Sequence, residues 1–298
     1  MDAVTEPLVY VVVLAWNQKE MTVECIRSLL ASQYSNMRLL VVDNGSTDGT
    51  SETLWGQFPQ IEIVRSPINR GIAGGYNIGL EYALAHGAEY ILVSNNDIIA
   101  EQTMLRFLVE ALESIPKAGI GLPKIYHYFG DKSRLWCTGA YWRKFPPSIK
   151  MMGVNAKDSQ RFSKLREIEY APSCCLLIRR NVLETIGYFD TGYFFYYDDW
   201  DFSARARKAG YSIWFIPQAK IWHKVSMSTQ KSRRPERWWY ILGRSTVRYY
   251  LRHSTSQMLG LYLTWFVIRE FIKLKPEHVP PFLAGVGHEV AITCGWTI

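Results

Sequence analysis

The sequence predicts an α/β fold with a mostly parallel central sheet. Short runs rich in Val, Ile and Leu alternate with segments of helical length, and polar turns separate them. Because parallel neighbours in a sheet need a crossover connection, repeated strand–helix–strand units indicate parallel strands. With 298 residues, 48% hydrophobic and 20% charged, the chain is long enough for one such domain and an appendage, and its composition excludes disorder throughout.

The first half of the chain supplies most of these elements in alternation. We expect strands over residues 8–15, 37–43, 61–65 and 90–94, and helices over residues 20–32, 50–58 and 75–86. Further along, residues 171–180 predict a buried strand entering a helix, residues 211–216 another strand, and residues 198–210 a helix. The apolar run 8–16 lacks the basic flank and cleavage site of a signal peptide, and the run 258–268 is too short to span a bilayer, so we expect no membrane crossing.

Several classes of protein are disfavoured by missing motifs. The first strand-to-helix turn, Ala15-Trp16-Asn17-Gln18, contains no glycine, which argues against a dinucleotide-binding oxidoreductase. No GxxxxGK[ST] motif occurs, which argues against a P-loop nucleotidase. The five cysteines form no CxxC pair, which argues against a structural zinc site and a disulfide framework.

Polar residues follow each predicted strand of the first half. Ligands of open α/β sheets bind beyond the carboxyl ends of the strands, so four polar turns on one rim indicate a nucleotide cleft. Ordinary turn and helix-cap chemistry is the alternative for any single turn. The turns are Ala15-Trp16-Asn17, Asp43-Asn44-Gly45-Ser46-Thr47-Asp48, Asn69-Arg70-Gly71 and Asn95-Asn96-Asp97.

Three groups of side chains are candidates for chemistry. Asp97 follows an apolar strand, where one carboxylate can hold a divalent ion against the phosphates of a nucleotide or can cap a helix. Asp198, Asp199 and Asp201 stand among aromatic residues at a predicted helix start, where catalysis by a general base and helix capping are both open. His223 is a candidate ligand for the same ion, and a structural role is its alternative.

The positive charge is concentrated at the end of the chain. Residues 1–219 carry 22 Lys and Arg against 23 Asp and Glu, whereas residues 220–298 carry 12 against 4. Basic and aromatic residues before an apolar run are typical of a helix at a membrane surface. A dimer interface, a helix packed on the preceding domain and a solvated basic face are the alternatives. The basic and aromatic residues are Arg233, Arg234, Arg237, Arg244, Arg248, Arg252, Trp238, Trp239, Tyr240, Tyr249 and Tyr250.

Taken in order over residues 8–225, these motifs resemble the family 2 inverting glycosyltransferases of the Rossmann-like GT-A fold. The resemblance lies in the segments 13–17, 41–50, 69–79, 95–97 and 197–201, followed by His223. Residues 69–79, Asn-Arg-Gly-Ile-Ala-Gly-Gly-Tyr-Asn-Ile-Gly, are similar to a rhamnosyltransferase-like subgroup, and we expect their glycines to let the backbone approach the donor. Asn95-Asn96-Asp97 stands where the family has a DxD motif and keeps a single carboxylate.

The resemblance implies roles for particular residues. It assigns Asp199 as the catalytic base with Asp198 as the alternative, and Asp97 with His223 as ligands of a divalent cation, Mg²⁺ or Mn²⁺. It assigns Asp43 to the nucleobase. The residues expected to bind the nucleotide are Ala15, Asn17, Asp43, Asn44, Ser46, Arg70, Gly71, Asn77, Asn95 and Asn96.

The implied reaction is a metal-assisted single displacement that moves a sugar from a nucleoside-diphosphate donor. We expect rhamnose as the sugar and a polysaccharide or lipid-linked oligosaccharide as the acceptor; galactofuranose, glucose and N-acetylhexosamine stay open. Residues 1–230 would form the catalytic domain, with a donor half to residue 121 and an acceptor half from residue 122, and residues 231–298 a helical extension. We expect a cytoplasmic enzyme, peripheral at the inner face of the plasma membrane. A nucleic-acid partner is not expected, and a non-catalytic nucleic-acid- or membrane-binding protein is the alternative from a different class.

Overall fold

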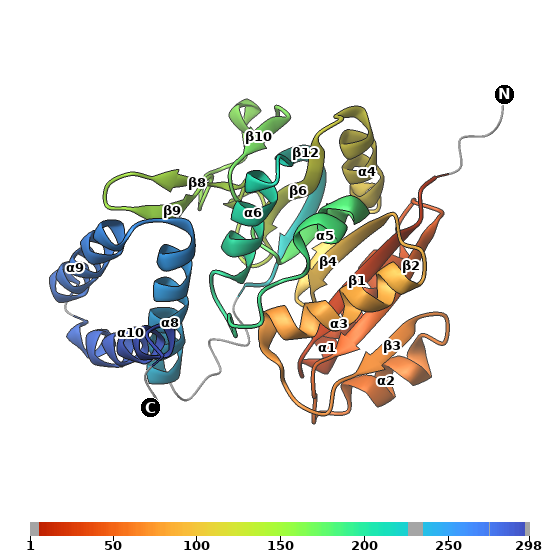
Figure 1. Ribbon diagram of the computed structural model, residues 1–298. Helices are drawn as coiled ribbons and strands as arrows, with labels where there is room; N and C mark the ends of the chain where they lie inside the picture. The colour runs from red at the N-terminus through yellow and green to blue at the C-terminus, as the bar shows by residue number, and fades with distance from the viewer. Residues whose placement is uncertain (1–5, 226–234, 274, 296–298) are drawn as a thin grey trace.

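A ten-stranded sheet forms the centre of the computed structural model, which describes residues 6–225, 235–273 and 275–295 (Figure 1). The strand order is β10-β12-β6-β11-β4-β1-β2-β3, with β5 beside β12 and β7 beside β6. A separate ribbon pairs β8 with β9. The strands are β1 (Val9–Ala15), β2 (Met37–Asp43), β3 (Glu62–Arg65), β4 (Tyr90–Asn95), β5 (Ile98–Ala100), β6 (Ala118–His127), β7 (Leu135–Cys137), β8 (Ala140–Arg143), β9 (Ser148–Met151), β10 (Arg166–Ile168), β11 (Cys175–Arg179) and β12 (Ser212–His223).

Helices cover both faces of this sheet, and Figure 1 shows α3, α5 and α6 over the near face. The helices are α1 (Lys19–Leu30), α2 (Thr50–Gln57), α3 (Gly71–Ala85), α4 (Met104–Ser114), α5 (Arg180–Ile186), α6 (Asp198–Lys208), α8 (Pro235–His253), α9 (Ser256–Ile272) and α10 (Val279–Thr293), with short 3-10 turns η1 (Gln160–Phe162) and η2 (Pro276–His278).

The expected α/β fold is confirmed. Strand β1 pairs in parallel with β2 and β4, β2 with β3, and β6 with β12. Strand β11 runs antiparallel between β4 and β6. The seven residues of β1 are all buried, as the apolar run predicts for a strand covered on both faces.

Several element boundaries differ from the expected ones. Helix α3 begins four residues before residue 75, at Gly71. Strand β12 continues past Pro217 to His223, because a register shift between Ile216 and Lys220 accommodates the proline. Between the 95–97 turn and α4, which begins at Met104, the short strand β5 pairs with β12.

The glycines of α3 serve helix–sheet packing more than they serve ligand approach. A Cβ at Gly75 would overlap Leu14, and one at Gly79 would overlap Val12, so both glycines let α3 lie directly on β1. Gly71, the first glycine of the segment, lines a cavity beyond the carboxyl ends of the strands, and its other glycines do not.

The C-terminal helices α8, α9 and α10 form a second hydrophobic cluster that includes Tyr170 and Tyr193 of the main domain. Helix α8 is docked on that domain by its basic and aromatic side chains: Tyr249 donates a hydrogen bond to Tyr170, and Arg248 and Arg252 pair with Asp190. These residues therefore correspond to the alternative in which the helix packs on the preceding domain.

Some of the expectations for the extension fall outside the described part of the chain. Arg233, Arg234 and the boundary between residues 230 and 231 all lie there. Among the residues that the structure describes, no helix combines the length and hydropathy that a bilayer-spanning segment requires.

Candidate functional site

A cavity of about 390 Å³ opens beyond the carboxyl ends of β1, β4 and β12 and at the N-terminus of α6. Its position agrees with the rule that ligands of open α/β sheets bind at that edge. Eight of the 14 catalytic, metal-binding and nucleotide-binding residues expected from the sequence line this cavity: Asn44, Gly71, Asn95, Asn96, Asp97, Asp198, Asp199 and His223.

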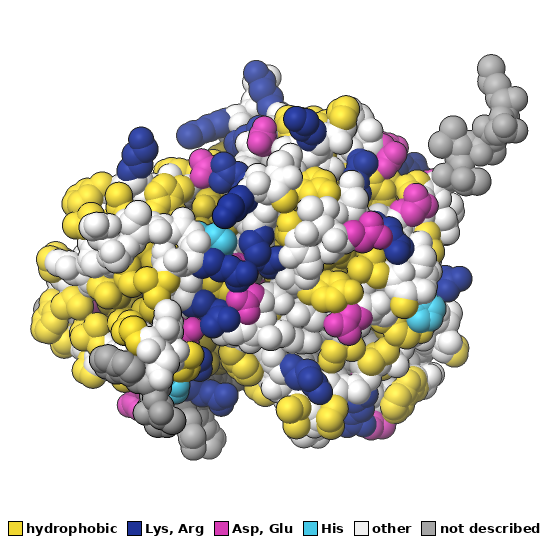
Figure 2. All heavy atoms as spheres, viewed as in Figure 1, with side chains coloured by type: hydrophobic (Ala, Val, Ile, Leu, Met, Phe, Trp, Pro, Cys, Tyr) yellow, Lys and Arg dark blue, Asp and Glu magenta, His cyan; other side chains and the backbone are white. Residues whose placement is uncertain are grey.

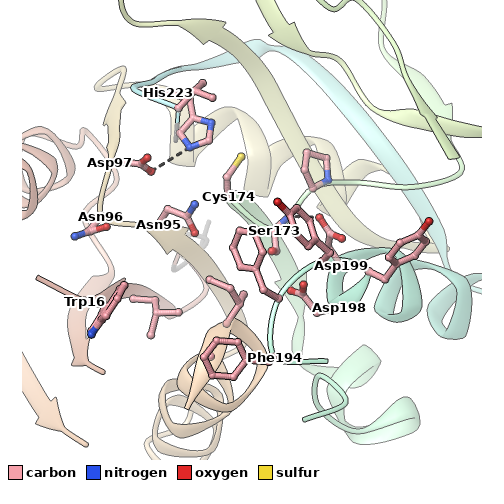
Figure 3. Close-up of a pocket in the computed structure, with 18 of the residues that line it drawn as sticks. Trp16, Asn95, Asn96, Asp97, Ser173, Cys174, Phe194, Asp198, Asp199 and His223 are labelled. Carbon is pink, nitrogen blue, oxygen red and sulfur yellow. Dashed lines mark hydrogen bonds and ion pairs between the residues drawn. The ribbon is translucent and has the colours of Figure 1, made fainter. Parts of the chain in front are cut away.

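Asp97 and His223 meet on one side of the cavity, although 126 positions separate them in the chain (Figure 3). Their contact joins His223 Nε2 to Asp97 Oδ1 at 3.0 Å, and both side chains are buried. Pairing of β12 with β5, which sets His223 against Ile98, brings them together. Burial raises the pKa of Asp97, but the interaction with His223, together with hydrogen bonds from the backbone and from Asn95, holds this pKa below its usual value.

Asp198 and Asp199 lie on another side of the cavity, beyond Ser173 and Cys174 in Figure 3. They begin α6, which follows two residues in left-handed backbone conformation, Tyr196 and Tyr197. Burial raises the pKa of Asp199, and the neighbouring carboxylate of Asp198 raises it further. Burial likewise raises the pKa of Asp198, to about 7. A buried acid whose pKa is raised is a candidate for proton transfer at a functional site.

An ion-pair network fixes the helix that carries these two acids. Asp201 of α6 is fully buried and accepts hydrogen bonds from Arg205 (2.7 Å) and His253 (2.7 Å), and it pairs with Arg252 at 3.2 Å. Because His253 and Arg252 belong to α8, the C-terminal extension helps to hold α6 in place. The contacts of Asp201 therefore stabilise the fold, whereas Asp198 and Asp199 line the cavity.

Six residues expected to bind the nucleotide do not line the cavity: Ala15, Asn17, Asp43, Ser46, Arg70 and Asn77. Most of them make hydrogen bonds that hold the turns around the cavity in place. Asn17 and Ser46 lock two turns together, since Ser46 Oγ accepts from Asn17 N at 2.8 Å and Asn17 Oδ1 accepts from Thr47 N at 2.9 Å. Asp43 is buried under the second turn, where it accepts from Ser46 N and Ser51 Oγ.

The remaining three residues of this set, Ala15, Arg70 and Asn77, have hydrogen-bond partners within the protein. Asn44 N donates to the carbonyl of Ala15, and the backbone N–H of Arg70 donates to Asn44 Oδ1. Asn77 is occupied by the backbone of Phe189, to which its amide both donates at 2.8 Å and accepts at 3.0 Å.

Aromatic residues make up much of the rest of the cavity wall. Trp136 lines the cavity and packs edge-on against His223, with ring centroids 4.7 Å apart. Trp238 was assigned only to the basic tail, yet it reaches the cavity from α8 and contacts Phe195. No spacing in the sequence signals this approach, because it depends on how α8 docks on the sheet domain.

Polar atoms without partners mark the cavity as a binding site. Within the described ranges, the buried side-chain polar atoms that lack a hydrogen bond include His223 Nδ1, Asp198 Oδ2 and Trp238 Nε1. All three belong to cavity-lining residues. Buried polar groups are nearly always paired, so these three atoms are available to a ligand in the cavity.

Asp97 and His223 fit a divalent cation. Asp97 Oδ1 and His223 Nε2 lie 3.0 Å apart, a hydrogen-bond distance that is also about the separation of adjacent ligands around an octahedral ion of this size. The described part of the chain holds no cluster of three or more His, Cys, Asp or Glu suited to a metal. A cation here would therefore depend on substrate phosphates and water for its other ligands, which is usual for Mg²⁺.

Comparison with known proteins gives a family match. Residues 10–187 match the family described as "Glycosyl transferase family 2", and residues 171–276 match "Glycosyl transferase family group 2". The chain is 25% identical to the N-acetylglucosaminyl-diphospho-decaprenol L-rhamnosyltransferase of Mycobacterium tuberculosis, over 68% of this chain and 72% of that one. It is 23% identical to the low-salt glycan biosynthesis hexosyltransferase Agl10 of Haloferax volcanii, over 90% and 87%.

The fold is also that of a solved glycosyltransferase. The mannosyltransferase PcManGT from Pyrobaculum calidifontis, solved with GDP-Man and Mn²⁺, superposes with a TM-score of 0.58 at 18% identity, covering 99% of this chain and 77% of that one.

Proposed function

The chain belongs to glycosyl transferase family 2 and is a glycosyltransferase of the GT-A type; on that premise, we propose that it transfers a sugar from a nucleoside diphosphate by a single displacement that inverts the anomeric carbon. The observation that carries this proposal is the cavity itself. It presents the Asp97–His223 pair on one side and the Asp198–Asp199 pair on another, with space for a sugar between them.

Asp199 is the proposed base. The acceptor hydroxyl oxygen attacks the anomeric carbon, the bond from that carbon to the diphosphate oxygen breaks, and the hydroxyl proton passes to the Asp199 carboxylate. The raised pKa of Asp199 makes this carboxylate a stronger base than an ordinary aspartate. Asp198 is the alternative base, and its buried Oδ2 has no partner among the described residues.

Asp97 and His223 are the proposed ligands of Mg²⁺ or Mn²⁺. A cation bound there would neutralise the charge that develops on the departing nucleoside diphosphate. The proposal is supported by the 3.0 Å separation of the two side chains and by the Mn²⁺ in the mannosyltransferase complex. Asn44, Gly71, Asn95 and Asn96, which line the same cavity, are the proposed contacts of the donor.

The aromatic wall is the proposed acceptor side. Sugar rings present C–H bonds that pack on aromatic faces, and Trp136, Trp200 and Trp238 offer such surfaces. The indole N–H of Trp238 has no partner in the described structure and is available to donate to a sugar hydroxyl. We therefore assign part of the acceptor site to the C-terminal extension.

Rhamnose is the proposed donor sugar and a lipid-linked saccharide the proposed acceptor. The support is the segment 69–79 together with the similarity to a relative named as an L-rhamnosyltransferase that acts on an N-acetylglucosaminyl-diphospho-decaprenol. Other hexoses are the second candidates for the donor sugar, because another relative, Agl10, is named as a hexosyltransferase.

A panel of nucleotide sugars tests this function. We expect the full chain, with Mn²⁺ or Mg²⁺, to release nucleoside diphosphate from one donor class, and we expect a chelator or Asp97→Ala to lower the rate at least about 100-fold. Asp131→Ala is the matched control, because Asp131 is exposed and lies outside the cavity. Full activity in chelator would contradict the cation, and inactivity with every donor would contradict the transferase.

A further inference from the structure

Helices α9 and α10 expose apolar side chains to solvent, whereas ordinary surface helices expose charged ones. The exposed side chains of these two helices, which are described throughout, include no charged residue. We define the α9–α10 outer face by large exposed apolar residues: Leu261, Ile268, Phe271 and Ile272 of α9, and Leu283 and Val290 of α10. A helix in water normally exposes its charged side and buries its apolar side.

The charged side chains of the same helices point inward. Glu270 and Glu289 are each only 2% exposed. Glu270 accepts from Arg269 at 2.7 Å, and Glu289 accepts from Arg244 and Arg248 of α8 at 2.9 and 3.0 Å. The Glu289 pairs thus join α10 to α8 from inside the bundle, while aliphatic side chains face outward.

The apolar residues of this face lie on one side of each helix, and Leu283 and Val290 of α10 are seven positions apart. Leu261, Ile268 and Ile272 recur at helical spacing on one side of α9, and Phe271 adjoins them. Figure 2 shows hydrophobic side chains gathered over α9 and α10, at the left of the view, with Lys and Arg concentrated elsewhere on that face of the molecule. Exposed apolar surface of this kind marks an interaction site.

The borders of this face carry cations. Lys273 and Lys275 are exposed in the turn that follows α9, where Glu277 is the exposed acid. Arg143 lies 5.8 Å from the ring centroid of Trp265, which sets the β8–β9 turn beside α9. That turn exposes Lys144 and 76% of Phe145. Cations around an apolar face match the phosphates of anionic lipids, and an aromatic residue beside them suits the headgroup level.

The geometry points to an anionic lipid bilayer as the partner: we propose that the α9–α10 outer face lies in the plane of its surface, with the aliphatic side chains below the headgroups and Lys144, Lys273 and Lys275 against lipid phosphates. The two helices have 17 and 15 residues, or roughly 25 and 22 Å at 1.5 Å per residue, which is less than the apolar thickness of a bilayer. The two helices are therefore long enough to lie along the bilayer surface with their apolar side chains buried, but too short to cross the bilayer.

Vesicle flotation of the full chain tests the proposal. We expect the protein to float with vesicles of phosphatidylcholine and phosphatidylglycerol, and the double variant Leu261→Glu with Ile268→Glu to lose at least about tenfold in partitioning. The matched control is Trp55→Glu with Leu165→Glu, which changes two apolar residues of similar exposure outside this face and should float like the parent chain. Thermal unfolding of each variant verifies that the fold is intact.

Charge is tested by a second variant. Lys273→Ala with Lys275→Ala should weaken binding to the anionic vesicles about tenfold and leave binding to pure phosphatidylcholine unchanged. The proposal is overturned if the parent chain stays with no vesicle, if the α9 variant floats as well as the control, or if anionic lipid gives no advantage.

Light scattering without lipid tests the main rival occupant, a second copy of the chain. A dimer that the α9 variant converts to monomer would assign the face to self-association, and a monomer in both cases supports the lipid partner. Flotation needs neither donor nor turnover, so its outcome is independent of the proposed reaction.

Discussion

Asp199 is the side chain on which the proposed chemistry depends most. Its Oδ1 accepts from the backbone of Trp200 at 2.9 Å and its Oδ2 from Ser173 at 3.4 Å. An amide at this position would keep the size and the place of the carboxylate but lose its ability to take a proton.

We expect Asp199→Asn to lower turnover by about 10²- to 10⁴-fold, the range for loss of a general base. Donor affinity should stay close to that of the parent chain, because the proposed donor contacts come from other turns. Steady-state turnover and calorimetric binding of the donor measure the two quantities, with Asp131→Asn as the control. Near-normal turnover in the variant would remove Asp199 from the mechanism.

The pH dependence of turnover follows from the same pair of acids. Burial and mutual repulsion raise the pKa of Asp199, and burial raises the pKa of Asp198 to about 7. Because the base acts only when deprotonated, the rate at saturating donor and cation should fall about tenfold per unit as the pH drops below the raised pKa. A rate that stays constant down to pH 5 would show that no such acid controls turnover.

The residues of the candidate site were predictable to different degrees. Asp97, His223, Asp198 and Asp199 carry local signals, because each follows a strand or begins a helix, and the structure places all four at one cavity. Trp238 carries no such signal, since its approach depends on the packing of α8 against the sheet domain.

At the scale of elements, helices α8 and α10 cross at two glycines, Gly243 of α8 and Gly285 of α10. A Cβ at Gly243 would overlap the carbonyl of Phe282, and one at Gly285 would overlap the carbonyl of Tyr240. The two helices therefore touch backbone to backbone, which explains how short helices form a tight bundle.

We expect Gly285→Ala to lower the free energy of unfolding by about 1–3 kcal/mol, because the added methyl must push the helices apart. Gly287→Ala, two positions along the same helix, is the matched control: nothing lies near its Cβ position, so it should be neutral or stabilising by up to about 1 kcal/mol. Urea unfolding measures both variants. Equal stabilities would mean that the crossing is looser than the structure describes.

Sequence patterns predict the elements of the first half well and those of the later chain less well. The strand 37–43 agrees with β2 at both ends, because apolar runs bounded by polar turns leave little choice. Strand β12 was expected to stop at Ile216, since a proline normally ends a central strand, and only the partner strand β6 reveals the register shift that lets it continue.

At the scale of the whole molecule, the extension connects three features. Helix α8 contributes Trp238 to the cavity and holds Asp201 of α6 through His253, while α9 and α10 present the apolar outer face. The face proposed to bind the membrane and the cavity proposed to bind the acceptor would thus lie on the same protein, so a lipid-anchored acceptor could reach the active site at the membrane surface. The sequence predicted a basic and aromatic tail but not which residues serve which side, because that division arises from the docking of α8.

The configuration of the product tests the central claim most directly. If one cavity holds the leaving diphosphate near Asp97 and His223 and the attacking hydroxyl near Asp199, transfer proceeds in a single displacement and inverts the anomeric carbon. Proton NMR of the freshly formed glycoside, compared with the donor, reports that configuration. Our account predicts inversion, and a product that retains the configuration of the donor would contradict it.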